Sequence, residues 1–402
     1  MAQRLNADHT DHSGPSLACA CGQRARYAGR HGKSIQTALG TMTLERAYYH
    51  CAACQRGYFP RDEALGMVAT ALSPALTRMI GLVGAMVSFE EGAELLGELA
   101  GIGVNAKQIE RTAEALGAAI ADDERQRVAP SPPEFAPTLY LGMDGTGIPM
   151  RAAELAGRQG KQPDGSAKTR EVKLCTLWSA EGRDAEGTPV RDEGSITYSA
   201  AIESAASRDT DTAPSPFAQR VQREARRRGF ELANRQVVLG DGAPWIWNLA
   251  DEYFPQAIQI VDRFHVKQHL SDVAKAIYGT GSDLATQWAR QRHDQLDAGD
   301  IDAIIACLDL HAKNCEVARQ CRGYLHTNRR RMRYPEFRAQ GLCTSTGVVE
   351  AGCKVAIGTR LKRAGMHWTL AGANAIIALR CCKLSRRFAD FWEVRAQGRL
   401  SA

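Results

Sequence analysis

The sequence predicts a mixed α/β fold for most of this chain, preceded by a small β-rich module and a helical region. Three observations lead to this prediction. From residue 139 onward, short apolar runs typical of buried strands alternate with helical patterns. Alternating residues on either side of Gly40, from Ile35 to Tyr49, predict a hairpin near the N-terminus. Between these parts, residues 72–127 show the apolar spacing of helices.

These patterns also give the expected domain order. A chain of 402 residues is long enough for about two or three domains. The predicted parts are a β-rich module at 1–62, a helical region at 63–128, a proline-rich linker at 129–138, the first part of the α/β core at 139–275, a helical insertion at 276–340 and the second part of the core at 341–402.

The composition is that of a globular protein. Hydrophobic residues make up 44% and charged residues 24% of the chain, which excludes wholesale disorder. Apolar stretches fall short of the roughly 20 residues that cross a bilayer, and the N-terminus lacks the pattern of a secretion signal. We therefore expect a cytoplasmic protein without a membrane partner, whose 12 cysteines stay reduced.

Four cysteines have the spacing of metal ligands. Cys19 and Cys21 form one pair, Cys51 and Cys54 form another, and the two pairs bracket the predicted hairpin. Four thiolates suit a structural zinc ion in a zinc-ribbon-like module, although the first pair is closer in sequence than in the commonest zinc knuckles. The alternative is four ordinary reduced cysteines. The other cysteines are expected to be packing residues.

The helical region has the pattern of two helices separated by a break at 101–103. The residues expected on the inner faces are Phe89, Ala93, Leu96 and Leu99 in the first helix and Ile109, Ala113 and Leu116 in the second. Asn105 followed by Gln108 is a plausible capping box for the second helix. Such a pair could be a DNA-binding helix-turn-helix or an ordinary helical hairpin.

Two aspartates are candidates for a catalytic site. Asp144 follows the apolar run Leu139–Met143, and Asp241 follows an apolar run that begins at Val237. Each lies beside glycine, and alone each would be read as a turn residue. If the two strands are neighbours, both carboxylates converge at one point, where their mutual repulsion favours a bound cation.

Glu350 is the candidate for a third carboxylate. It lies in a segment with small residues before and after it, which permits close packing of a helix on the sheet. The alternative is that Glu350 and Lys354 form an i,i+4 surface salt bridge. Three carboxylates would suit Mg²⁺ or Mn²⁺, with two ions about 4 Å apart acting on the two oxygens of a phosphoryl displacement.

The motifs together resemble those of a known family, the bacterial insertion-sequence transposases of the Kra type in the Mutator-like branch of DDE transposases. The matching segments run in order along nearly the whole chain: Leu44–Cys51, Met143–Thr146, Gly240–Ala243 and Gly347–Cys353. The resemblance implies an RNase H-like fold. In that fold Asp144 ends the first strand, Asp241 follows the fourth, and Glu350 comes after an all-helical insertion.

The resemblance also gives His265 a role. The branch carries Asp or Cys, two residues and then His after the fifth strand, and Asp262-Arg-Phe-His265 matches this pattern. We expect His265 to brace the site or to contact a phosphate, whereas alone it would be read as a locally satisfied histidine. His265 could also act as a general base, but a metal ion that activates the attacking water would make a protein base unnecessary.

Basic residues lie in runs that flank the candidate site. Lys and Arg total 51 against 45 Asp and Glu, a net charge of +6, which permits a polyanionic partner without requiring one. Such runs are usually solvated helix faces but also fit phosphate contact. The expected nucleic-acid contacts are Arg330, Arg331, Lys354, Arg360, Lys362, Arg363 and Trp368. Trp368 could stack on an unpaired base or pack in the core.

The resulting functional expectation is a DNA transposase. It would bind the terminal inverted repeats of its insertion sequence, cleave phosphodiester bonds and join the freed 3′ hydroxyls to target DNA, acting as a homo-oligomer at the nucleoid. Two alternatives stay open: a metal-dependent structure-selective nuclease, and a DNA-binding regulator with a degenerate catalytic domain. The sequence lacks a phosphate-binding loop motif, so no nucleotide cofactor is expected.

Overall fold

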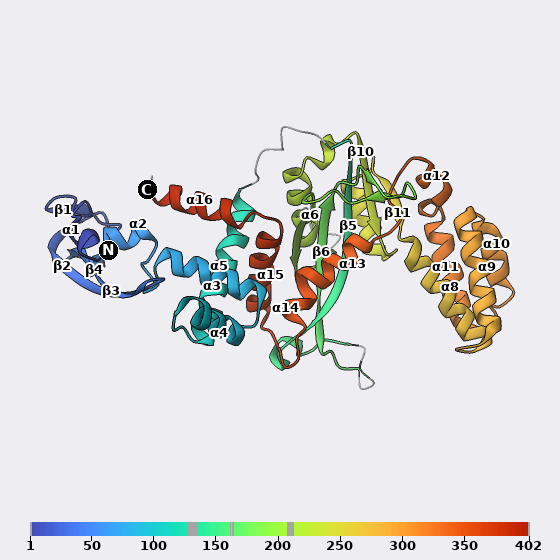
Figure 1. Ribbon diagram of the computed structural model, residues 1–402, viewed down its shortest axis with the longest axis horizontal. Coiled ribbons are helices and arrows are strands. Elements are labelled where there is room, and N and C mark those ends of the chain that lie inside the picture. Colours follow the sequence, from blue (N-terminus) through green and yellow to red (C-terminus); the bar gives the residue numbers. More distant parts are fainter. Residues whose placement is uncertain (1, 128–135, 161, 163–164, 207–212, 401–402) are drawn as a thin grey trace. The chain divides into compact units, whose positions relative to one another are not determined.

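The computed structural model describes residues 2–127, 136–160, 162, 165–206 and 213–400 (Figure 1). The chain divides into two compact units, one of residues 1–121 with 386–402 and one of residues 122–385. The last helix, α16 (Phe388–Leu400), therefore belongs to the first unit, whereas the sequence analysis grouped it with 341–385. Most of the predicted linker at 129–138 lies outside the described residues.

The first unit begins with a small antiparallel sheet. Its strands, in the order in which they pair, are β1 (Ser16–Ala18), β2 (Arg24–Thr37), β3 (Gly40–Cys51) and β4 (Arg56–Tyr58). The predicted hairpin is confirmed, because β2 and β3 pair as far as Thr37 opposite Gly40. Gly40 has φ +106°, a conformation that favours glycine in this tight turn. Helices α1 (Ala2–Ala7) and α2 (Pro60–Leu65) pack on β3.

The helices of the first unit agree in part with the prediction. They are α3 (Pro74–Met86), α4 (Phe89–Ala100) and α5 (Ala106–Gln126). The Asn105 side chain accepts a 2.8 Å hydrogen bond from the Gln108 backbone N–H, and the inner stripe predicted for α5 is buried. In α4 the prediction is wrong for Leu99, whose side chain is 81% exposed, because the buried face of this helix runs through Gly92 and Leu96.

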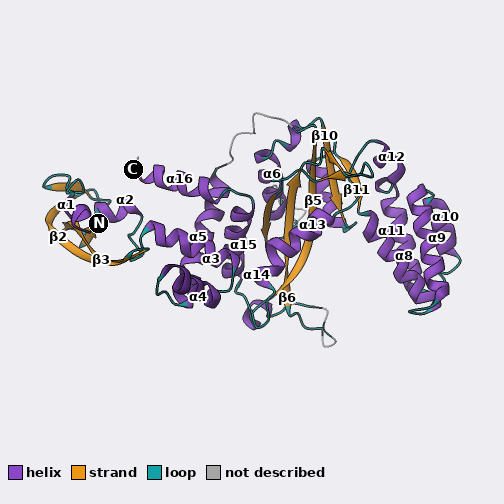
Figure 2. Cartoon of the chain, viewed as in Figure 1, coloured by secondary structure: helices purple, strands orange, loops and turns teal. Residues whose placement is uncertain are grey.

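The second unit contains a mixed sheet, so the predicted mixed α/β architecture is confirmed. Its strands within the described residues are β11 (Ile258–Val261), β10 (Arg235–Gly240), β5 (Thr138–Pro149), β6 (Thr169–Trp178) and β9 (Thr197–Ala201), in that spatial order. β11, β10 and β5 are parallel to one another, and β6 and β9 continue the sheet in antiparallel pairings (Figure 2). A separate short ribbon pairs β7 (Gly182–Arg183) with β8 (Pro189–Val190).

Helices pack against this sheet. They include α6 (Pro216–Arg227), which contacts β6 and β9, α15 (Leu370–Leu384), which packs on β9, and α7 (Pro244–Tyr253), which follows β10. The strands bring apolar side chains into a shared core, where the fully buried rings of Tyr140 and Trp178 stack with centroids 5.3 Å apart. Burial of this apolar surface holds in place β5 and β10, the strands that position the candidate site.

Between β11 and residue 340 the described chain is helical. This helical segment, residues 263–339, contains α8 (Arg263–Tyr278), α9 (Asp283–Ala298), α10 (Ile301–Asp309), α11 (Glu316–Asn328) and α12 (Tyr334–Ala339).

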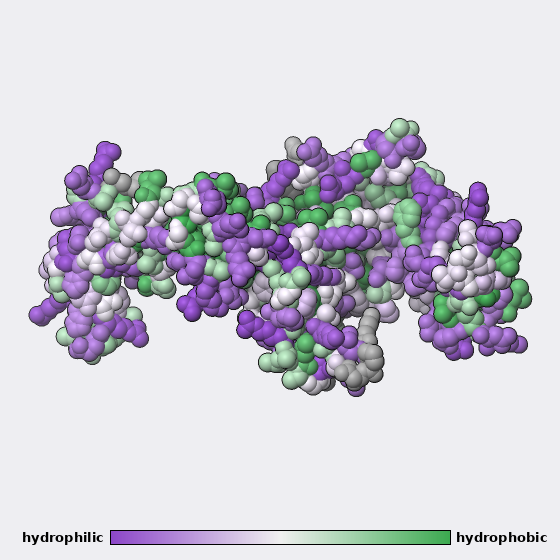
Figure 3. Space-filling model, turned by 60° about the horizontal axis from the view of Figure 1, so that its bottom comes forward, coloured by the Kyte–Doolittle hydropathy of each residue, from purple (hydrophilic) through white to green (hydrophobic). Residues whose placement is uncertain are grey.

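On the face drawn in Figure 3, hydrophilic residues surround smaller apolar areas. Within the described residues, every helix is too short or too polar to cross a membrane.

The segment after residue 346 contains an irregular helix. It starts as α13 (Gly347–Gly352), continues through a π-helical stretch at Cys353–Gly358 and ends as α14 (Thr359–Leu361). α13 packs on β5 and β6. π-helical stretches inside helices occur often at functional sites, and this one directly follows the helical turn that carries Glu350.

Candidate functional site

The sheet brings Asp144 and Asp241 together. β5 and β10 are parallel, with Leu239 opposite Gly142, and two further residues along this register place Asp241 beside Asp144. Asp144 was predicted to end its strand, but it lies within β5, opposite Leu174 of β6. Asp241 follows the last residue of β10, as predicted. Asp144 in β5 and Asp241 directly after β10 therefore lie at the same level of the sheet.

The two carboxyl groups interact electrostatically. Burial raises the pKa of Asp144, and the nearby charge of Asp241 raises it further. The Cys353 thiol and the Gly145 N–H oppose this rise by donating hydrogen bonds to the Asp144 carboxyl. Asp241 accepts a 2.9 Å hydrogen bond from the Ala243 N–H. A cation between the two acids would relieve the repulsion that disfavours two charges here.

Glycine allows α13 to lie close to β5. A Cβ atom on Gly142 would come within 2.2 Å of Val349 Cγ2, so any larger residue there would displace the helix. Gly142 and Asp144 are two residues apart on a strand and share one face, which is the face that α13 covers. The Cys353 thiol, at the end of α13, reaches Asp144 from the same side.

Glu350 lies on this helix but does not join the two aspartates in this structure. Its carboxylate pairs with Lys354 Nζ at 2.8 Å, and the two side chains are 66% and 73% exposed. Among the described residues, the three acids do not form a group whose ligand atoms lie within 4.8 Å of one another. Glu350 is one helical turn before Cys353, and its charge contributes to raising the pKa of that buried thiol.

Asp262 fixes the segment that leads into α13. Its carboxylate caps α8 by accepting hydrogen bonds from the backbone N–H groups of Phe264 and His265. The other carboxylate oxygen accepts a 3.0 Å bond from the Thr346 N–H and a second bond from the Thr346 hydroxyl. One buried side chain thus joins the end of β11, the start of α8 and the start of the Glu350 helix.

His265 lies near Asp144 and belongs to a cluster that was not predicted from the sequence. Its charge would lower the pKa of Asp144, and its Nε2 lies 3.1 Å from Nε2 of His269. Tyr324 of α11 donates a 2.9 Å hydrogen bond to the backbone carbonyl of Asp241. The i,i+4 spacing of the two histidines could have suggested their contact, but nothing local in the sequence pointed to Tyr324.

The basic residues predicted to contact nucleic acid lie in different surroundings. Lys354, Lys362, Arg363 and Arg330 are exposed. Lys362 donates to the Thr146 hydroxyl, two residues after Asp144 on the same strand. Its charge lies close enough to act against the rise in the pKa of Cys353. Lys362 therefore contributes positive charge beside Asp144.

The remaining three predicted contacts are engaged within the protein. Arg331 donates a 2.6 Å hydrogen bond to Gln259 and lies over the Trp247 ring. Arg360 is fully buried, with its guanidinium 5.4 Å from the Trp368 ring centroid. Trp368 is 6% exposed, and its indole N–H donates to the Leu361 carbonyl, so it packs in the interior in this structure.

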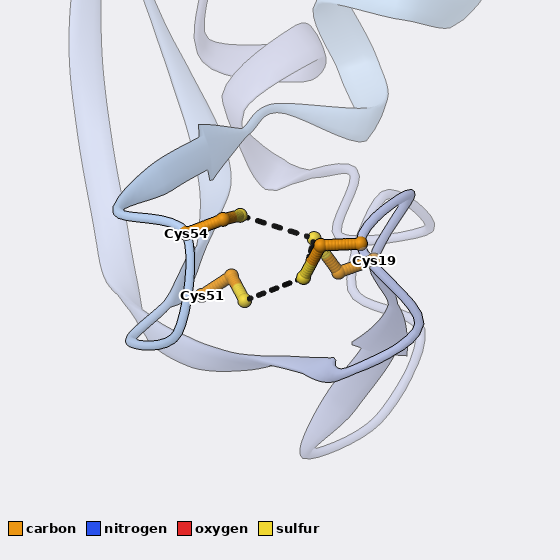
Figure 4. A group of neighbouring side chains, drawn as sticks. Cys19, Cys51 and Cys54 are labelled. Atoms are coloured by element: carbon orange, nitrogen blue, oxygen red, sulfur yellow. Dashed lines mark hydrogen bonds between the residues drawn. The ribbon is translucent and has the colours of Figure 1, made fainter.

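The four predicted cysteine ligands come together in the first unit (Figure 4). Cys19 Sγ lies 3.4 Å from Cys54 Sγ and 3.3 Å from Cys21 Sγ, and Cys21 Sγ lies 3.7 Å from Cys51 Sγ. These separations exceed a disulfide bond of about 2.05 Å. They approach the roughly 3.8 Å between sulfurs around a tetrahedral zinc with bonds of about 2.3 Å. The four thiols could therefore hold a metal ion.

The surroundings shift the pKa values of Cys19 and Cys54 in opposite directions. The Cys21 N–H and the Tyr58 hydroxyl, 2.9 Å from Cys19 Sγ, lower the pKa of Cys19 to about 6. The Arg56 N–H favours the thiolate of Cys54, but burial and the neighbouring thiols raise the pKa of Cys54 to about 12. The neighbouring thiols thus favour the thiolate of Cys19 but disfavour that of Cys54, and a bound metal would favour both thiolates.

Comparison with known proteins assigns the family. No related chain is found among curated proteins. The sequence profile of an uncharacterised protein family, UPF0236, matches residues 22–387, which include the cysteine pair of β3–β4, both aspartates and the Glu350 helix. This match spans nearly the whole sequence, and the chain therefore belongs to the uncharacterised protein family UPF0236.

Proposed function

We propose that this chain is a DDE-type DNA transposase with Asp144, Asp241 and Glu350 as its catalytic acids. The observation that carries the proposal is the meeting of Asp144 and Asp241 on adjacent parallel strands, where the charge of one raises the pKa of the other. Two half-buried like charges side by side cost free energy, and such an arrangement is more typical of a functional site than of a structural one.

The sheet order supports an RNase H-like assignment. In the five-stranded sheet, the first three strands along the chain form an antiparallel meander of β5, β6 and β9. The next strand, β10, pairs in parallel with the other edge of β5, and β11 pairs in parallel with β10. The resemblance implies this layout, with Asp144 at the end of the first strand and Asp241 directly after the fourth. The helical segment that separates β11 from α13 fits the expected insertion before the third acid.

The donor set suits a hard divalent cation. Mg²⁺ is commonly held by one or two carboxylates together with water and substrate phosphates, and Asp144 and Asp241 supply two. A bound Mg²⁺ or Mn²⁺, two per site in the full proposal, would activate the attacking water and stabilise charge on the scissile phosphate. We propose that Glu350 completes the ligand set by leaving Lys354, since an exposed i,i+4 pair costs little to break.

The chain's own residues would orient the DNA. Lys362 lies next to Asp144 through Thr146 and, with exposed Lys354, Arg363 and Arg330, offers positive charge for phosphate oxygens. His265 would brace the site from the α8 side. A structural zinc ion on Cys19, Cys21, Cys51 and Cys54 would stabilise a module that contacts DNA ends or a second copy of the chain.

Cleavage and strand-transfer assays test the proposal. The full-length protein is incubated with Mg²⁺ or Mn²⁺ and end-labelled DNA that carries the inverted repeats flanking its gene, together with plasmid target. We expect end cleavage and joining that fall by at least about 100-fold in Asp144→Asn, Asp241→Asn and Glu350→Gln. Asp309→Asn, an exposed acid of the helical segment, is the matched control.

The assay also separates the alternatives. Cleavage without joining would identify a nuclease. DNA binding with no cleavage in either metal would identify a DNA-binding regulator. Either result would overturn the transposase assignment.

A further inference from the structure

The helical segment reaches the candidate site through Tyr324. Its hydroxyl donates a 2.9 Å hydrogen bond to the carbonyl oxygen of Asp241, which is 83 residues earlier in the chain. The next residue, Gly242, has φ +96°, and a Cβ atom there would lie 2.4 Å from the Tyr324 ring. The turn that carries Asp241 is therefore shaped to receive this tyrosine ring.

A second side chain of the helical segment reaches the site beside Tyr324. The His269 ring packs on the Tyr324 ring with centroids 4.6 Å apart, and the Tyr324 ring also neighbours His265 at 6.4 Å. His269 Nε2 lies 3.1 Å from His265 Nε2. At this distance one nitrogen must donate and the other accept, so each ring restricts the tautomer and orientation of the other.

The surroundings favour a neutral His269. Burial lowers the pKa of His269, and the neighbouring His265 lowers it further, while Asp272 and Asp241 oppose this with their negative charge. The half-buried ring packs against the Tyr324 ring of α11, and its Nε2 lies within hydrogen-bond distance of His265 Nε2. A neutral imidazole in this position can donate to or accept from His265 without adding charge to the site.

We propose that Tyr324 and His269 are positioning residues, through which the helical segment holds the catalytic groups of the proposed enzyme. Tyr324 fixes the peptide of Asp241, and His269 fixes the tautomer of His265. This inference rests on the proposed function. It adds two residues outside the acidic triad, and through them the helical segment would act on catalysis indirectly, by holding Asp241 and His265 in place.

Conservative variants test the role of each residue. Tyr324→Phe keeps the ring and removes only the hydroxyl that bonds to Asp241. His269→Ala removes the partner of His265, and His269→Gln restores a side-chain amide that can bond to it. The matched controls are Tyr278→Phe and His311→Ala, whose rings contact each other elsewhere in the helical segment with centroids 6.2 Å apart.

We expect Tyr324→Phe and His269→Ala to lower the single-turnover cleavage rate by about 10-fold, the effect of losing one hydrogen bond in the transition state. DNA affinity and melting temperature should match those of the controls. His269→Gln should recover part of the rate lost in His269→Ala. This split between rate and affinity, together with the recovery, distinguishes positioning from a general loss of folding.

Failure of the inference and failure of the proposed function give different results. If the wild type cleaves and the Tyr324 and His269 variants cleave at the rate of their controls, the positioning role is wrong and the proposed function stands. If the cleavage rate of these variants falls only as much as the fraction of folded protein falls, the two residues have a structural role and the inference is also wrong. A wild type that never cleaves overturns both.

Discussion

The backbone N–H of Thr346 donates a 3.0 Å hydrogen bond to the carboxylate of Asp262, 84 residues earlier in the chain. The Thr346 hydroxyl bonds to the same oxygen, and the other oxygen of Asp262 caps helix α8. Thr346 immediately precedes α13, which carries Glu350. The Asp262 carboxylate therefore links the end of β11 to the start of α8 and to the start of α13.

Replacing Asp262 should cost both stability and activity. Asp262→Ala removes a helix cap and leaves buried donors unpaired, so we expect a loss of about 1–3 kcal/mol in the free energy of unfolding. Cleavage should fall as well, because the start of the Glu350 helix loses its anchor. Urea denaturation and the cleavage assay measure the two effects. Thr346→Val, which loses one hydrogen bond, should lie between wild type and Asp262→Ala.

Glu350 should matter for activity far more than for stability. Its exposed pair with Lys354 contributes no more than about 0.5 kcal/mol, so Glu350→Gln should melt within a degree or two of wild type yet lose cleavage. Glu336→Gln breaks a comparable exposed pair with Arg333 and serves as the control. Equal cleavage by the two variants would mean that Glu350 forms only a surface salt bridge.

Asp144→Asn should stabilise the protein at neutral pH when no divalent ion is added. The pKa of Asp144 is raised from its ordinary value of 3.8, so the folded state holds the proton more tightly than the unfolded chain. Ionisation of Asp144 therefore lowers the stability of the folded protein. This loss is complete at a pH above the raised pKa of the folded state, and it disappears at a pH below the ordinary pKa of the unfolded chain. Calorimetry should show a higher melting temperature for Asp144→Asn at about pH 7 and a smaller difference at about pH 4. A lower melting temperature at neutral pH would contradict this.

Zinc should hold the first unit together. We expect one zinc ion per chain, lost in Cys54→Ser and retained in Cys315→Ser, whose cysteine lies outside the cluster. Structural zinc contributes about 10–16 kcal/mol, comparable to the whole stability of a small domain, so chelation should abolish an unfolding transition. Elemental analysis and melting curves measure both. Zinc-free protein with an unchanged melting curve would show that these are ordinary thiols.

Local patterns in the sequence predicted much of the fold. The hairpin around Gly40 and the inner stripe of α5 were predictable because strand and helix periodicities act over a few residues. Leu99 was placed on the wrong face because α4 has apolar residues on more than one side, and only packing decides which is buried. The extension of β5 beyond Asp144 depends on its pairing with β6, which no local pattern reveals.

Residues of the candidate site could be predicted only where a local sequence motif marks them. Asp144 and Asp241 could be paired because both follow apolar runs beside glycine. Tyr324 could not be predicted, because its contact with Asp241 depends on how the helices of residues 263–339 pack. The surroundings of Trp368 likewise depend on a distant partner, since its backbone pairs with Met150 at the end of β5.

Binding of Mn²⁺, followed by electron paramagnetic resonance, tests whether Asp144 and Asp241 form one metal site. The account predicts that the wild type and Asp309→Asn bind the ion with equal affinity, and that Asp144→Asn and Asp241→Asn each weaken binding by at least about 10-fold. Mn²⁺ binding of wild-type strength in both folded variants would contradict the account.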